Sequence, residues 1–293
     1  MGSPRGTASD TSWLGTPIDV RPLFAPESAS LLGLLRTLRP ADWGKAAVPG
    51  WTVRDLAAHL LGDYRGRLGW ATPGFRPAFG PGETLEAFIH RVNQEWVDLH
   101  ADTDPATLVG ALERTGAQVA RQFEGADLDA MGLGVSWAGA MPTAPNWLDT
   151  AREFTEYWTH RQQIRHAVGR DTDTATRPLA AVLDTFLRAL PHTLRDTPAT
   201  AGTQVQVVID GQSGGTWTAT ATPTATPTAT EAARWSLAEA PAGPPTASVR
   251  LDPETAWRLC SRGIEPDAAL AAAHLQGTPH LARAALHIVS IVR

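Results

Sequence analysis

The spacing of apolar residues changes near residue 170, and this change constrains the fold more than any other feature of the sequence. Before it, apolar side chains recur every three or four positions in successive segments, as on one face of an α-helix. After it, TQVQVVID and TWTATAT alternate with a period of two, which is typical of strands with one solvated face. We therefore predict an α+β protein of two domains, the first helical and the second mixed.

The first part of the chain is typical of a helix bundle. Its predicted helices run over 28–38, 52–67, 84–100, 105–123 and 147–168. Thr52 and Asp55 have the spacing of a capping box at the start of the second helix. Gly169 follows the last helix in the position where a left-handed residue ends a helix. We expect an up-down bundle whose functional sites are built from inward-facing side chains.

The predicted domain boundaries follow from these patterns. We expect a flexible tail over 1–24, the bundle over 25–169, a linker over 170–177 and an α+β domain with an antiparallel sheet over 178–293. Within the bundle, 125–146 is rich in Gly and has little periodicity, so it predicts a loop that is either a functional lid or a simple connection. The tract TATPTATPTAT predicts an edge strand or a loop, because its prolines cannot donate ladder hydrogen bonds.

Composition excludes several classes of protein. Cys260 is the single cysteine, so the chain can form neither an intramolecular disulfide nor a cysteine-based metal site. The net charge of −5 and the absence of a dense basic cluster argue against binding to nucleic acid or to a membrane surface. No apolar run approaches the roughly 20 residues of a membrane helix, and no signal peptide opens the chain. We expect a soluble, cytoplasmic protein.

Three side chains form a candidate metal site. Glu156 and His160 are four residues apart on a predicted helix, so they share one face, although such a pair is more often a solvated surface pair. His59 interrupts an apolar helix face between Leu56 and Leu60, where a core histidine bonded to a backbone carbonyl is the alternative. Together the three side chains offer a His, Glu, His donor set with room for a further ligand, which suits a divalent metal.

Two phrases carry a family resemblance. GWTVRDLAAHLLGD and EFTEYWTHRQQIRHAVGR resemble the mycothiol-dependent maleylpyruvate isomerase family of DinB-like metalloenzymes. The segment SVRLDPETAWRLCSRGIEPDAALAAAHLQGTPHLARAALHIV is similar to the sterol-carrier-like C-terminal domain of that family. The resemblance implies that His59, Glu156 and His160 bind a divalent metal, usually zinc, and that mycothiol is a co-substrate. The chain has one lysine and many arginines, a bias typical of the G+C-rich actinobacteria that make mycothiol.

The same resemblance implies an arginine in the C-terminal domain that reaches the active site. Arg262 is the nearest match, although Ser261 stands before it where relatives tend to have glycine. Arg258 and Arg283 are the alternatives. Such an arginine would hold a substrate carboxylate, because its planar fork gives bidentate contact.

The predicted function is a zinc- and mycothiol-dependent enzyme, either an isomerase or a thiol transferase, that adds a thiolate to an electrophilic small organic substrate. Two alternatives remain: a metal-dependent hydrolase or lyase that needs no thiol, and a non-catalytic metal- or ligand-binding module. The chain offers no evident nucleophile of its own. Ser213 in GQSGG lies between two predicted strands and is interpreted as a turn residue, and Cys260 as a packing residue.

Overall fold

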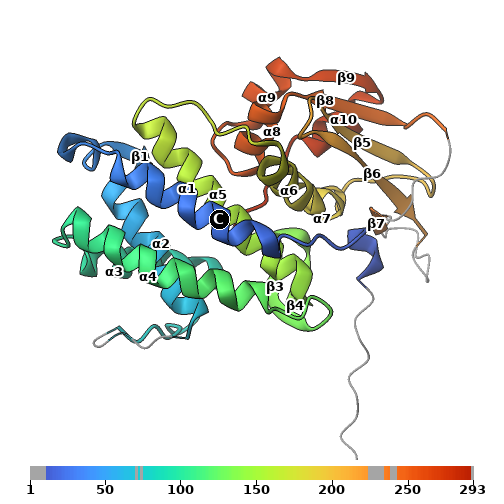
Figure 1. The fold of residues 1–293 in the computed structure, drawn as a ribbon. Helices are drawn as coiled ribbons and strands as arrows, with labels where there is room; N and C mark the ends of the chain where they lie inside the picture. The colour runs from blue at the N-terminus through green and yellow to red at the C-terminus, as the bar shows by residue number, and fades with distance from the viewer. Residues whose placement is uncertain (1–10, 70–71, 73–74, 224–233, 238–242, 292–293) are drawn as a thin grey trace, which may run out of the picture. The chain divides into compact units, whose positions relative to one another are not determined.

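The computed structural model describes residues 11–69, 72, 75–223, 234–237 and 243–291. Its contacts divide the chain into two compact units, which we call the helical unit and the sheet unit (Figure 1). The helical unit comprises Asp19–Ala130 and Asp149–Pro178, and the sheet unit comprises the segment that ends at Ile18, Met131–Leu148 and Leu179–Ile291. The predicted α+β class is confirmed. No helix of the described part is both long and apolar enough to cross a bilayer.

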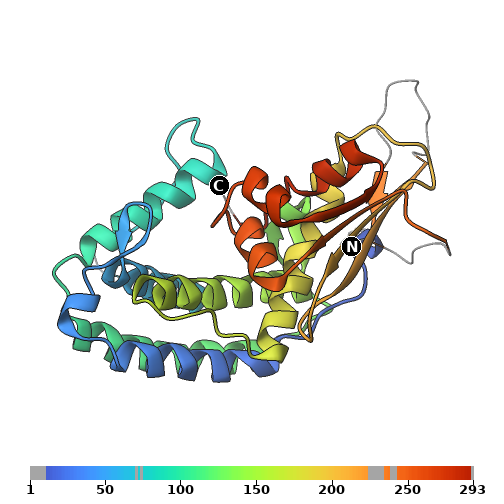
Figure 2. The same cartoon turned by 90° about the horizontal axis from the view of Figure 1, so that it is seen from above.

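The main helices of the first part are α1 (Phe24–Arg36), α2 (Val53–Arg67), α3 (Leu85–Leu99), α4 (Pro105–Glu124) and α5 (Asn146–Ala167). Short elements join them: the 3₁₀ turns Arg21–Leu23 and Pro40–Asp42, and the hairpin of β1 (Ala46–Val48) and β2 (Trp51–Thr52). Helix α1 lies along α4, and α2 packs against both α4 and α3 (Figure 2). In this arrangement, one face of α2 and one face of α5 lie buried in the interior of the helical unit.

Local signals position these helices as predicted. Thr52 caps α2, since its Oγ1 accepts a hydrogen bond from the Asp55 backbone N–H and the Asp55 carboxylate accepts one from the Thr52 N–H. Gly169 after α5 has φ +77°, the left-handed conformation expected of a residue that ends a helix. The core is aromatic: the Phe24 ring stacks on Phe123 with 4.2 Å between centroids. Helix α1 begins four residues earlier than predicted, because its first turn joins this core.

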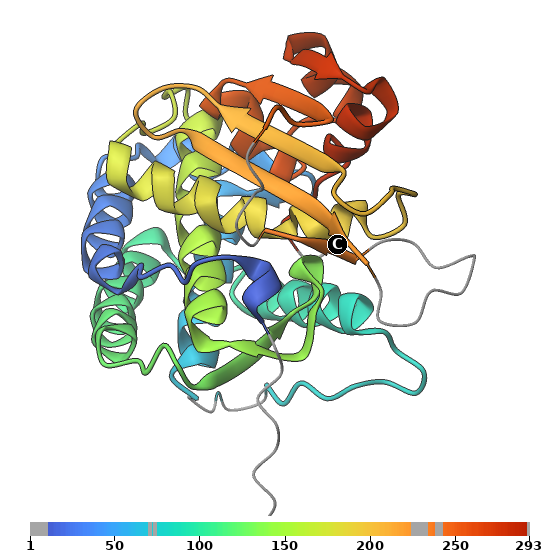
Figure 3. The same ribbon diagram turned by 90° about the vertical axis from the view of Figure 1, so that its right-hand side faces the viewer.

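The sheet unit contains a five-stranded sheet in the order β7-β6-β5-β8-β9, whose strands lie side by side in Figure 3. Its strands are β5 (Gln204–Ile209), β6 (Gly215–Thr222), β7 (Arg234–Ser236), β8 (Ala247–Leu251) and β9 (His274–Gly277). The sheet is mixed, so the prediction of an antiparallel sheet is wrong in one pair: β5 and β8 are parallel. After β7 the chain crosses to the far side of β5, and a strand that arrives by such a crossover can run parallel to its neighbour.

Helices and turns complete the sheet unit. They are the 3₁₀ turns Ser12–Leu14 and Leu187–Ala189, α6 (Thr176–Phe186), α7 (Leu190–Leu194), α8 (Pro253–Cys260), α9 (Pro266–Ala272) and α10 (Pro279–Ala285). Helix α8 begins at the predicted cap, where the Asp252 carboxylate accepts the Thr255 N–H. Leu14 and Val20, both within the predicted tail, are fully buried. Most of the TATPTATPTAT tract lies outside the described residues.

The segment 125–146 is not the irregular loop that its composition predicts. Residues Met131–Val135 form β3 and Ala140–Pro145 form β4, an antiparallel hairpin joined by the 3₁₀ turn Ser136–Ala138. Glycines alternate with the apolar residues of β3. The strand therefore lacks the alternation of polar and apolar residues by which a strand is predicted from sequence. Gly134 is needed for close approach, since a Cβ there would lie 2.6 Å from the Pro142 carbonyl oxygen.

Candidate metal centre

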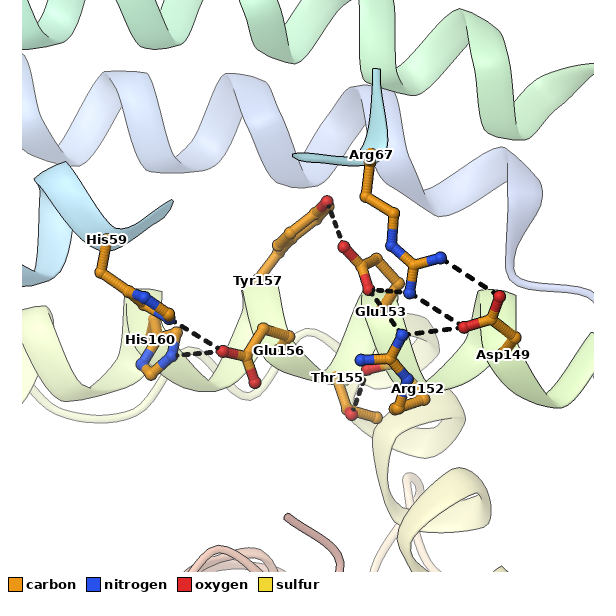
Figure 4. A network of polar contacts seen from close by, with 9 residues as sticks. All are labelled: His59, Arg67, Asp149, Arg152, Glu153, Thr155, Glu156, Tyr157 and His160. Carbon is orange, nitrogen blue, oxygen red and sulfur yellow. Dashed lines mark hydrogen bonds and ion pairs between the residues drawn. The ribbon is translucent and has the colours of Figure 1, made fainter. Parts of the chain in front are cut away.

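Helices α2 and α5 bring the three predicted ligands together inside the helical unit (Figure 4). The His59 Nε2 lies 3.0 Å from Glu156 Oε1, across 97 positions of sequence. The His160 Nε2 lies 2.7 Å from the same oxygen. One ligand atom from each side chain lies within 4.8 Å of the other two. Both imidazoles therefore direct a nitrogen at one carboxylate oxygen, and a metal ion that entered between the three atoms would meet all of them.

The hydrogen bonds of His160 fit the donor set to a metal. Its Nδ1–H donates to Gln163 Oε1 over 2.7 Å, which leaves Nε2 as the nitrogen that faces Glu156. Histidines that bind metals commonly use one nitrogen for the ion and donate the other N–H to an oxygen. Both nitrogens of His160 face oxygens, and the Glu156 carboxylate supplies the negative charge that a cation at this point would need.

The pKa shifts of the three groups have distinct causes. Burial lowers the pKa of His59, against the opposing effect of Glu156. Burial also disfavours the charged form of His160, but the Glu156 carboxylate and Gln163 outweigh it and raise the pKa of His160. Burial alone would raise the pKa of Glu156, yet the two imidazoles together hold it well below the ordinary value. Glu156 is thus an anion at neutral pH, the form that binds a cation.

Access to the three ligands is graded. The side chain of His59 is 8% exposed, that of His160 14% and that of Glu156 31%. The Trp51 ring lies beside the His59 ring, with 5.0 Å between centroids, and its indole N–H donates to Gln94 of α3. Trp51 thus lies next to the ligands on the His59 side, and Glu156 is the most exposed of the three.

A second polar cluster, mostly buried, continues from the ligands along the same two helices. The Arg67 guanidinium donates to both oxygens of Asp149, at 3.1 and 2.9 Å, and to Glu153. The Tyr157 hydroxyl donates to Glu153 over 2.7 Å. Along α2 the order is His59, Asp63, Arg67 at intervals of four, so each helical turn adds one polar side chain to the interface with α5. The cluster ties α2 to α5 and thereby fixes the distance between His59 and its partners.

Asp63 is a further buried carboxyl group beside this cluster. Burial and the neighbouring Glu153 carboxylate raise the pKa of Asp63 well above its ordinary value. Its Oδ2 is buried, and its side chain lies within hydrogen-bonding reach of Glu153. Asp149 and Glu153 in turn lie opposite two arginines, Arg67 and Arg152.

Sequence reasoning missed Gln163 and the internal cluster. The signal was present, because Gln163 follows His160 by three residues and Asp63 follows His59 by four, each within one turn of a ligand. Ser213 lies in the β5–β6 turn and Cys260 is buried, as predicted.

Arg262 lies in the sheet unit, directly after α8. It has φ +58°, a conformation that non-glycine residues seldom adopt. Its Nε and Nη2 atoms are buried and find no hydrogen-bond partner among the described residues. Backbone strain of this kind is enriched at functional sites, and buried donors ordinarily have a partner. Its predicted role toward a substrate stays a prediction.

This chain is similar to two solved structures and to one protein family. Two crystal structures are similar over 85% of this chain and 90% of theirs: the mycothiol-dependent maleylpyruvate isomerase, at 17% identity and a TM-score of 0.45, and a histidine-to-alanine variant of that enzyme, at 15% identity and a TM-score of 0.45. No curated protein gives a significant match. The family model of the mycothiol maleylpyruvate isomerase N-terminal domain matches residues 24–165, which include all three candidate ligands. Residues 24–165 therefore belong to the mycothiol maleylpyruvate isomerase N-terminal domain family.

Proposed function

We propose that this protein is a metal-dependent enzyme that uses a low-molecular-weight thiol, mycothiol, to act on an electrophilic small organic substrate. The observation that carries the proposal is the convergence of His59, Glu156 and His160 on one partly open point, inside a segment of this family. We infer that the metal is zinc, because imidazole and carboxylate ligands suit it.

A divalent metal held at this point would lower the pKa of a bound thiol and so supply a thiolate nucleophile at neutral pH. The chain's own residues support an external nucleophile. Burial raises the pKa of Cys260 to about 12, so its thiol is neither charged nor accessible. Ser213 lies in a hairpin turn without a helix after it. Glu156 and the two histidines would hold the metal, and Trp51 would shield the His59 side from water.

Addition of a thiolate to an activated double bond converts that bond to a single bond and allows rotation. Expulsion of the thiolate after rotation gives a cis–trans isomer and returns the thiol, whereas protonation of the adduct gives a thioether. These outcomes define an isomerase and a thiol transferase. We propose that Arg262 holds a carboxylate of the substrate, since its unpaired N–H groups distinguish it from Arg258, which donates to Gly263.

A thiol-independent hydrolase or lyase is the second candidate, because the same donor set could bind water. The experiment that separates them incubates the zinc-loaded full chain with maleylpyruvate, with and without mycothiol, and follows both the substrate and the thiol by mass spectrometry. We expect turnover only with the thiol. Recovery of free thiol beside a trans isomer identifies an isomerase, and a thioether identifies a transferase.

The control variants come from one helix. His160→Ala removes a candidate ligand, and we expect it to lose thiol-dependent turnover. His166→Ala removes a histidine that bonds to Thr172 instead, and we expect it to keep turnover. Equal turnover with and without mycothiol would contradict the proposal.

A further inference from the structure

Solvent reaches the middle of α5 along one line of side chains. From Asp149 to Gln162 every residue of this helix is buried except Arg152, Glu156 and His160. These three are spaced by four residues, so they share one face of the helix. Two of them are candidate metal ligands. The open side of the candidate metal centre therefore continues along α5 to Arg152, and Figure 4 shows Arg152 on the side of Glu156 that faces away from His160.

The guanidinium of Arg152 is held by two carboxylates, but one of its hydrogen-bond donors has no acceptor among the described residues. Its Nη2 lies 2.8 Å from Asp149 Oδ1 and 3.1 Å from Glu153 Oε2. Its Nε is buried and makes no hydrogen bond within the described part of the chain. A buried charged donor without an acceptor is unfavourable, and such donors ordinarily have a protein, water or ligand partner. The side chain as a whole is 24% exposed, so a ligand on the open line can reach the guanidinium, although Nε itself is buried.

Arg67 provides an internal comparison. It bonds to the same two carboxylates, Asp149 and Glu153, but through both of its Nη atoms, and its side chain is only 13% exposed. Arg67 lies on α2 and makes a bidentate contact that joins α2 to α5, whereas Arg152 lies on α5 with both carboxylates. Arg152 meets the same carboxylates from the open side, and its Nε is a donor that the cluster does not use.

We propose that Arg152 binds an acidic group of the substrate, one helical turn from the metal ligands. Four residues of α-helix advance by about 6 Å, so the acidic group would lie about that far along α5 from Glu156. A guanidinium that is already oriented by two carboxylates makes a directional contact to a carboxylate oxygen at a small loss of side-chain freedom. Arg152 is then a specificity-determining residue of the helical unit, separate from Arg262. The inference rests on the proposed function for the metal centre.

The test measures binding rather than turnover. The zinc-loaded full chain is titrated with succinate by calorimetry, because this saturated dicarboxylate cannot undergo thiol addition. We expect Arg152→Gln to bind succinate about 10- to 100-fold more weakly than the wild type, as for loss of one charge-assisted contact. Binding of the neutral analogue succinamide should not change. Zinc content should also not change.

The matched control is Arg165→Gln, on the same helix, whose guanidinium donates to the Asp171 carbonyl instead; it should bind succinate like the wild type. If Arg152→Gln does not fold, Arg152→Lys keeps the positive charge opposite Asp149 and Glu153 but lacks the remaining guanidinium donors, and it should bind succinate at least about 3-fold more weakly. Wild-type affinity for succinate in the folded variant, or an equal loss for succinate and succinamide, would overturn the proposal. Since no thiol is present, neither result depends on whether the enzyme uses mycothiol.

Discussion

The hydrogen bond between Gln163 and His160 allows a quantitative prediction about the metal centre. Gln163→Leu removes the acceptor that lies 2.7 Å from His160 Nδ1, without changing the ligands themselves. Loss of such a partner typically lowers metal affinity about 10- to 100-fold. This range corresponds to about 1.4–2.7 kcal/mol. Gln163 is partly exposed, so water can replace part of the contact, and we expect the lower half of the range.

The assay is a competition for zinc between the protein and a chromophoric chelator at fixed pH. Gln163→Glu is the matched variant, because it keeps an oxygen acceptor at the same place and adds a negative charge. We expect it to bind zinc at least as tightly as the wild type. Wild-type zinc affinity in the leucine variant would refute the reasoning that Gln163 orients His160 for the metal.

Three further predictions test the packing and the buried titratable groups. Gly62→Ala places a Cβ 2.6 Å from Trp96 Nε1 and should lower the free energy of unfolding by about 1–3 kcal/mol, measured by urea denaturation; an unchanged transition would mean that the indole moves freely. Native Cys260 should resist iodoacetamide at pH 8, since its pKa is about 12 and it is buried, whereas the unfolded chain should be alkylated fully; rapid labelling of the native protein, seen by intact mass, would contradict this. Asp63→Asn should become more stable relative to the wild type as pH rises above about 4, because the native wild type keeps a proton on Asp63 that the unfolded chain releases. Thermal melting of both proteins across pH measures this, and a difference in melting temperature that stays constant with pH would contradict it.

Signals that act within one or two helical turns were readable from the sequence. The Thr52 and Asp55 cap, the turn at Gly169 and the shared face of Glu156 and His160 each depend on residues a few positions apart, and the structure contains all of them. His59 required more. Its contact with Glu156 spans 97 positions, and no periodicity specifies which helix will face it. Its place on an otherwise apolar helix face made His59 a candidate ligand, and the family resemblance then implied that it binds the same metal as Glu156 and His160.

The features that sequence reasoning missed depend on pairing between distant segments. The parallel pairing of β5 with β8 follows from the path of the chain after β7, which local alternation does not encode. In the β3–β4 hairpin, glycines occupy the positions where polar residues would mark a strand, and Gly134 is there because the partner strand lies close. The unpaired Nε of Arg152 likewise cannot be predicted from the sequence, because it depends on how Asp149 and Glu153 lie around the guanidinium in the folded chain.

The central claim is that His59, Glu156 and His160 hold a metal whose open position takes an external thiol. Zinc-edge X-ray absorption of the loaded Cys260→Ala variant, recorded before and after addition of mycothiol, tests it most directly. Removal of Cys260, the single cysteine, leaves the added thiol as the source of any new sulfur ligand. We expect a shell of nitrogen and oxygen neighbours alone at first, and a zinc–sulfur distance of about 2.3 Å once the thiol is added. Spectra that stay identical after saturation with mycothiol would contradict the account.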